Sequence, residues 1–202
     1  MKFKINDIYL GNAYNLIKEI PDKSIDLVLT DPPYDIGTSH GSGIWKTQEA
    51  AYLKQIESAE INNGFDFSLL DELCRVLKKI NIYIFCSKSQ VLKLLNYFVA
   101  KGCNFEILLW EKDNPPPLCG THYLVDKEFC LYFWETGAYL HTTYDTGRTI
   151  YRTKTNIADK EIYKHPTCKN ILMCETLIKN SSEAGGGYIR SILRQRNYCE
   201  SC

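Results

Sequence analysis

The stretch "IDLVLTDPPY", residues 25–34, decides the fold and the place of a binding site. It begins with a short apolar run of the kind that forms a buried strand. The run ends at Asp31, Pro32 and Pro33, where two prolines fix the backbone and remove two amide donors. Ligands of open α/β sheets bind beyond the carboxyl ends of the strands. We therefore expect residues 31–34 to line a site at the end of this strand.

The rest of the chain alternates between strand-like and helix-like segments. Apolar runs rich in β-branched and aromatic residues predict further strands over 81–87, 105–110 and 128–135. Apolar residues at helical spacing predict helices over 67–79 and 89–102. This alternation is typical of an α/β fold with a mainly parallel sheet.

Two polar stretches interrupt this order. Residues 35–64 contain "GTSHGSG" and predict a long mobile loop with a short helix around 47–57. A loop of that length inside a compact domain usually has a function. Residues 136–164 predict a second irregular insert, which carries basic residues with tyrosines among them. These basic and aromatic residues could contact the phosphates and bases of a nucleic acid, and a solvated loop without a binding role is the alternative.

Composition narrows the class of protein. The 202 residues include 24 Lys and Arg and 24 Asp and Glu, so the net charge is zero and contact with nucleic acid would have to be local. There is no apolar run that could span a bilayer and no signal peptide at the start, so we expect a cytoplasmic protein. Most of the nine cysteines lie in apolar stretches and should be buried, reduced thiols. No metal site is expected, because Cys199 and Cys202 are two ligands and zinc takes four.

The segment after the first strand has the chemistry to hold a planar base. Asp31 and the carbonyls beside the prolines can accept hydrogen bonds from an exocyclic amine, and Tyr34 offers a flat ring face. Two adjacent prolines alone would merely end a strand. The whole sequence "TDPPY" after an apolar strand favours the binding site.

These residues carry a resemblance to a known family. The stretch "LVLTDPPYDIG" resembles motif IV of the amino-group DNA methyltransferases that use S-adenosylmethionine, and an Asp at its first position indicates adenine N6 more than cytosine N4. Residues 8–34, 108–117 ("LLWEKDNPPP") and 164–170 ("KHPTCKN") are similar to further elements of that family. Their order is that of the β class. The resemblance covers roughly residues 5–180 and implies a Rossmann-like methyltransferase fold within a catalytic domain over 1–183.

The resemblance also implies roles for single residues. The flipped adenine would be held by the catalytic residues Asp31, Pro32, Pro33 and Tyr34. S-adenosylmethionine would be bound by Asn12, Asp31, His165, Thr167 and Lys169, although many members of the family carry an acid at the position of Asn12. Double-stranded DNA would be contacted by Lys46, Asn114, Arg148, Arg152 and Lys154. A cognate restriction endonuclease is a further partner that the resemblance allows.

The family's next element is absent from the sequence. An Asp-Pro-Phe-x-Gly-x-Gly cofactor loop should follow residue 183, but residues 184–202 read "AGGGYIRSILRQRNYCESC". Read one base later, codons permitted for this tail spell Asp-Pro-Phe and then Gly-Ser-Gly-Thr-Thr. We therefore expect a frameshifted terminus and an incomplete fold that lacks the central cofactor strand and the elements after it. Such a chain would have unpaired apolar sheet edges, bind the cofactor poorly and tend to self-associate.

Two other functions remain open on the sequence. The chain could be a non-catalytic remnant that binds DNA through residues 35–64 and 136–164. It could also be an amino-group methyltransferase that acts on RNA or protein, because Pro-Pro-Tyr loops serve other amino groups too.

Overall fold

A computed structural model gives the fold of the chain. The structure describes residues 7, 9, 11–35, 65–115, 123–154, 168–183 and 188–191. Of the loop expected over 35–64, it describes Asp35 alone. The short helix expected around 47–57 therefore lies outside the described residues, as does the end of the insert after Lys154.

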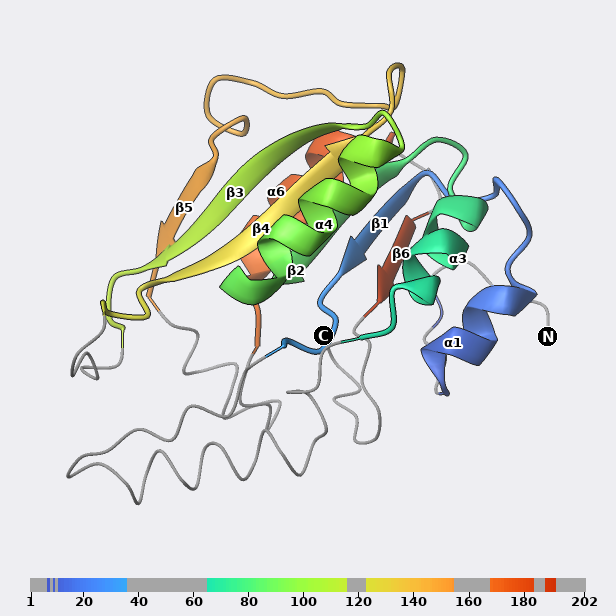
Figure 1. Cartoon of the computed structure of the whole chain (residues 1–202). Coiled ribbons are helices and arrows are strands. Elements are labelled where there is room, and N and C mark those ends of the chain that lie inside the picture. Colours follow the sequence, from blue (N-terminus) through green and yellow to red (C-terminus); the bar gives the residue numbers. More distant parts are fainter. Residues whose placement is uncertain are drawn as a thin grey trace.

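A mixed, mainly parallel sheet of six strands forms the centre of the molecule (Figure 1). The order across the sheet is β5-β3-β4-β2-β1-β6, and β4 alone runs antiparallel to both of its neighbours. The other pairs, β1 with β2, β1 with β6 and β3 with β5, are parallel. The strands are β1 (Leu27–Thr30), β2 (Asn81–Cys86), β3 (Asn104–Lys112), β4 (Lys127–Trp134), β5 (Ile150–Thr153) and β6 (Tyr188–Ser191). The predicted mainly parallel sheet is confirmed.

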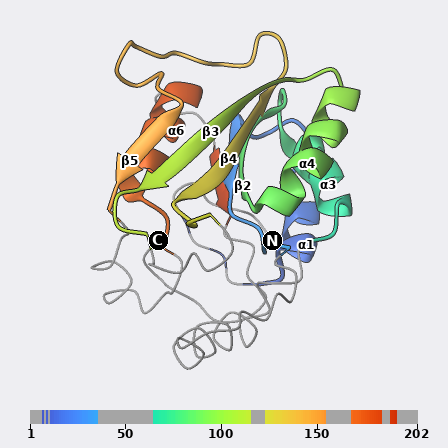
Figure 2. The ribbon, with the colours of Figure 1, turned by 60° about the vertical axis from the view of Figure 1, so that its left-hand side comes forward.

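Helices cover both faces of this sheet (Figure 2). On one face lie α1 (Ala13–Leu16), η1 (Ile17–Glu19), α3 (Ser68–Val76) and α4 (Lys88–Ala100), and on the other lies α6 (Ile171–Ser181). Successive residues of a strand point to opposite faces, so Val28 packs under the α3 and α4 layer while Leu27 and Leu29 pack under α6. Because both faces are covered, all six residues of β2 are buried.

The sequence did not predict the helix α6. Two predictions from the sequence also need correction, one for the insert over 136–164 and one for the C-terminal tail. Part of the insert over 136–164, predicted to be irregular, forms β5, which pairs in parallel with β3 from Leu109↔Ile150 onward. A strand of four residues with alternating exposure gives only a weak signal in the sequence. The pairing with β3 stabilises this strand, because its local strand propensity is too weak to do so.

The second correction concerns the C-terminal tail. Its residues 188–191 form β6 and pair in parallel with β1, in the register Leu27↔Tyr188 to Thr30↔Ser191. β1 is therefore not one of the unpaired sheet edges that the sequence analysis expected. Strand pairing uses backbone N–H and C=O groups, which almost any sequence can offer. The remainder of the tail, including Cys199 and Cys202, lies outside the described residues.

The described part of the chain contains six cysteines, and all six are reduced thiols. Five of these six are buried, and Cys74 is partly buried. The predicted burial of the thiols is confirmed for this part of the chain. The described helices include none that is both long and apolar enough to cross a membrane.

Candidate active site

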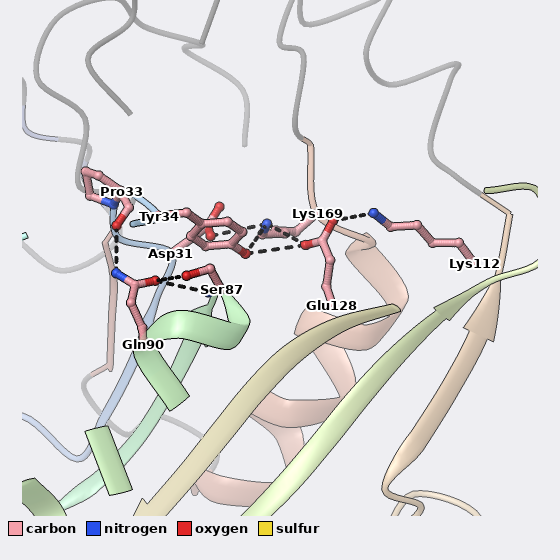
Figure 3. Close-up of polar contacts among 8 residues, drawn as sticks. All are labelled: Asp31, Pro33, Tyr34, Ser87, Gln90, Lys112, Glu128 and Lys169. Carbon is pink, nitrogen blue, oxygen red and sulfur yellow. Dashed lines mark hydrogen bonds and ion pairs between the residues drawn. The ribbon is translucent and has the colours of Figure 1, made fainter. Parts of the chain in front are cut away.

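The segment Asp31–Tyr34 leaves the carboxyl end of β1 and lies against the start of α4 (Figure 3). The side chain of Gln90 donates from Nε2 to the Pro33 carbonyl at 3.1 Å. The hydroxyl of Ser89 donates to the Asp35 carbonyl at 2.7 Å. The Pro33 carbonyl, which the sequence analysis expected to be free for a ligand, therefore already accepts one hydrogen bond from the protein.

A capping box at the start of α4 holds these contacts in place. The side chain of Ser87 caps the helix, and Gln90 Oε1 accepts from the Ser87 backbone N–H at 3.0 Å. Gln90 is 2% exposed, so its amide is fixed between the helix start and the proline segment. The pattern Ser-x-x-Gln after a predicted strand is the sequence signature of a capping box. This capping box was not among the predictions from the sequence.

Asp31, Tyr34 and Lys169 are brought together in one buried cluster (Figure 3). The Lys169 ammonium lies 3.2 Å from Asp31 Oδ1 and donates to the Tyr34 hydroxyl at 2.7 Å. It also lies 4.7 Å from the centre of the Tyr34 ring. The side chain of Lys169 is 8% exposed and that of Asp31 is 18% exposed. The sequence placed Lys169 beside the cofactor, and the structure brings it to Asp31.

Two further charged residues complete this cluster, and the sequence analysis missed both. Glu128, at the start of β4, accepts from the Lys169 ammonium at Oε2 over 2.7 Å. Its other oxygen, Oε1, accepts from the Lys112 ammonium at 2.6 Å. Lys112 lies at the end of β3 and belongs to the element "LLWEKDNPPP". The available signal was a carboxylate at the first residue of the predicted strand over 128–135, and a cation two residues beyond the predicted strand over 105–110.

Burial and mutual attraction set the protonation states of the cluster. Burial raises the pKa of Asp31, and Lys169 opposes this rise. Burial would also raise the pKa of Glu128, but Lys169 and Lys112 outweigh it and hold that pKa at about 2. Asp31 therefore takes up a proton at a higher pH than Glu128 does.

The two hydrogen-bond donors of the cluster keep their protons. Burial lowers the pKa of Lys169, but the two carboxylates of Asp31 and Glu128 outweigh it and hold the pKa well above its ordinary value. Burial and Asp31 raise the pKa of Tyr34 well above that of a free phenol. Near neutral pH the site contains an ammonium ion at Lys169 and a neutral phenol at Tyr34.

Other residues predicted for the site have partners elsewhere. Asn12 caps α1 and accepts from the Tyr14 N–H at 2.9 Å. Arg152, on the exposed face of β5, donates to Glu111 at 2.9 Å. Asn114 follows the end of β3. Three predicted residues lie outside the described part of the chain: Lys46, His165 and Thr167.

The described part of the insert after β4, residues 136–154, contacts both ends of the sheet. Its first part is tied to the end opposite Asp31, where the Tyr139 carbonyl accepts from Asn81 and the Thr146 carbonyl accepts from Asn180. Arg148 follows this part, and its guanidinium lies 5.0 Å from the centre of the Tyr144 ring. The later part returns along β5 toward the site end, where Thr153 bonds to Asn170, the neighbour of Lys169. Lys154 is therefore closer to the site end than the first part of the insert.

Comparison with known proteins identifies the fold. Residues of this chain superpose on the complex of M1.HpyAVI with SAM with a TM-score of 0.62 at 17% identity, over 90% of this chain and 80% of the other. The PvuII DNA methyltransferase, described as cytosine-N4-specific, gives 0.58 at 13% identity, over 90% and 72%. The Rossmann-like methyltransferase fold expected from the sequence is confirmed.

The family follows from the sequence comparisons. A family model for DNA methylases, N6_N4_Mtase, matches residues 25–189, and the chain belongs to this family. The Type II methyltransferase M2.MboI of Moraxella bovis is 27% identical over 225 residues, covering 95% of this chain and 81% of that protein. The Type II methyltransferase M1.MboII of the same species is 24% identical, covering 84% of this chain and 58% of that protein.

Proposed function

We propose that this protein is a β-class DNA methyltransferase that transfers a methyl group from S-adenosylmethionine to N6 of an adenine flipped out of duplex DNA. The observation that carries the proposal is the Asp31 carboxylate, 18% exposed, which shares Lys169 with Tyr34 at the carboxyl end of β1. Asp at the first position of the motif supports adenine. Cytosine N4 is the second candidate, because a protein of the same fold is described as cytosine-N4-specific.

The described residues fit the methionine part of the cofactor. S-adenosylmethionine carries an ammonium and a carboxylate on that part, and the site offers a carboxylate at Asp31 and an ammonium at Lys169. When bound, the cofactor supplies an electrophilic methyl group on a sulfonium. The titration states support this fit, since Lys169 is charged at neutral pH.

The protein's own groups would act by position and charge. Asp31 would accept a hydrogen bond from the exocyclic amine and direct its lone pair toward the methyl group. As the nitrogen gains positive charge, the Asp31 carboxylate offsets it until the proton leaves. The face of Tyr34 would stack on the base, and unstacking that base from DNA costs a few kcal/mol. No covalent link between protein and substrate is needed.

A methyl-transfer assay tests this proposal. The full chain is incubated with duplex DNA and S-adenosylmethionine carrying a labelled methyl group, and the digested nucleosides are analysed by mass spectrometry. We expect N6-methyladenine, formed slowly because the expected frameshift weakens cofactor binding, and a further loss of about 100-fold or more in Asp31→Asn. Glu106→Gln, which changes an exposed carboxylate at the far end of β3, should retain activity. N4-methylcytosine as the product would establish the second candidate instead.

The other functions have distinct outcomes in the same experiments. Transfer to RNA or protein but not to DNA would identify a different amino-group methyltransferase. Binding of DNA without calorimetric binding of S-adenosylmethionine would identify a non-catalytic DNA-binding protein. The expected frameshift stays a prediction, which the nucleotide sequence beyond codon 183 tests.

A further inference from the structure

Three motifs of the sequence meet at a carboxylate that belongs to none of them. Glu128 Oε2 accepts from Lys169 of the "KHPTCKN" element at 2.7 Å and from the Tyr34 hydroxyl of "TDPPY" at 3.4 Å. Its Oε1 accepts from Lys112 of "LLWEKDNPPP" at 2.6 Å. These partners are 41, 94 and 16 residues away along the chain. Glu128 is therefore the common partner of the three elements (Figure 3).

We propose that Glu128 is a positioning residue that shares the Lys169 ammonium with Asp31, so that the Asp31 carboxylate stays available to the target amino group. This role deepens the proposed function and rests on it. Glu128 acts through Lys169 and makes no contact with the reacting atoms in the proposal.

The distances support an unequal sharing of the ammonium. The separation of 2.7 Å between Lys169 Nζ and Glu128 is that of a strong charge-assisted hydrogen bond. The separation of 3.2 Å to Asp31 Oδ1 is at the long end of the range. Asp31 thus interacts with Lys169 more weakly than Glu128 does. The Asp31 carboxylate can therefore accept a hydrogen bond from an incoming amine.

Because these charges have little access to water, each one depends on its charged partners. The side chain of Lys169 is 8% exposed, that of Lys112 is 14% exposed, and that of Glu128 is 18% exposed. Buried charges that lose a partner cannot be compensated by water. If Glu128 became neutral, Lys169 would have Asp31 as its remaining carboxylate among the contacts described, and the two would close into a tighter pair. The target amine would then compete with a full ammonium for Asp31.

A purely structural role for Glu128 predicts something different. In that case its neutralisation would lower the stability of the fold and change the ionisation of Asp31 only slightly, through the loss of charge repulsion alone. In the positioning role, neutralising Glu128 removes a negative neighbour of Asp31 and gives Asp31 an undivided Lys169. Both changes favour the ionised form of Asp31.

The test is a carboxyl titration by NMR on the full chain with ¹³C-labelled aspartate, comparing the wild type with Glu128→Gln. The Asp31 signal is assigned by its loss in Asp31→Asn. We expect the titration midpoint of Asp31 to fall by about one pH unit in Glu128→Gln. An unchanged or higher midpoint overturns the proposal.

A matched control uses the other cation of Glu128. Lys112→Met removes the partner of Oε1 and leaves the contact between Glu128 and Lys169, so the Asp31 midpoint should not fall. If Glu128→Gln does not fold, the double variant Glu128→Gln/Lys112→Met is compared with Lys112→Met. It removes one buried acid and one buried base together, which is the better tolerated change. The same fall is expected in that pair, and its absence overturns the proposal.

This titration needs no catalysis, so its result is separate from that of the methyl-transfer assay. A fall in the Asp31 midpoint without any methyl transfer would refute the proposed function and leave the sharing of Lys169 intact. In a protein that transfers methyl groups, Glu128→Gln should lower kcat with KM for DNA little changed, because the DNA surface is not altered.

Discussion

The two ends of the sheet carry the same kinds of charge in different surroundings. At the site end, the side chains of Asp31, Glu128 and Lys169 are 8–18% exposed and share their partners. At the opposite end, the pairs Lys78–Asp26 and Lys101–Asp71 have side chains 29–65% exposed. The exposed pairs are weak because water screens them, whereas each buried charge depends on its neighbours. A net charge of zero over the chain conceals this difference.

The largest effect should come from removing the central cation of the site. Lys169→Met leaves two buried carboxylates without their shared partner, and we expect the free energy of unfolding to fall by about 3–5 kcal/mol. Lys101→Met, at the opposite end, should cost at most about 1 kcal/mol. Urea denaturation of both variants measures the two values. Equal losses would show that the two ends do not differ as described.

The next largest effect should be the fall in the free energy of unfolding at acid pH. Because the pKa of Glu128 is held at about 2, below the ordinary 4.5, Glu128 stabilises the fold above the ordinary value, and this contribution is lost as the pH falls through the folded pKa. The loss amounts to about 3 kcal/mol between the two values. Asp31 has the opposite sign, because its raised pKa favours the folded state at low pH.

Glu128→Gln should therefore flatten the fall in stability below pH 4.5. Thermal or urea unfolding across this range measures it. Asp71→Asn, an exposed aspartate at the other end of the sheet, serves as the control and should leave most of the fall in place. A steep acid limb that survives in Glu128→Gln would contradict the assignment of the low pKa to this residue.

The smallest effect should be a difference between the two parts of the insert in how their cations contribute to DNA binding. If the proposed function is right, Lys154, next to the site end, contacts a phosphate, and Lys154→Ala should reduce the slope of log affinity against log salt by about 1. Arg148→Ala should change it less, because the insert before Arg148 is tied to the opposite end. Fluorescence anisotropy with a duplex oligonucleotide measures both, and a larger effect of Arg148→Ala would reverse the assignment.

Much of the fold could be predicted locally, and the two strands that could not be predicted share a cause. The strands β1 to β4 lie in apolar runs and the helices α3 and α4 are amphipathic, so their sequences indicate them. The short strands β5 and β6 lack such runs and exist by pairing with β3 and β1. Pairing of that kind depends on neighbours far along the chain and leaves little trace in the local sequence.

The sequence by itself determined that a strand ends in Asp-Pro-Pro-Tyr, and that Asp31, Tyr34 and Lys169 belong to recognisable motifs. Only the tertiary structure decided that Tyr34 and Lys169 meet at Glu128, with Asp31 on the same ammonium. The reversed direction of β4 brings its first residues beside the end of β2 and the end of β3, in the registers Cys86↔Phe129 and Trp110↔Glu128. Buried charges interact through space over a few ångströms, and the spacing of residues along the chain does not encode that distance.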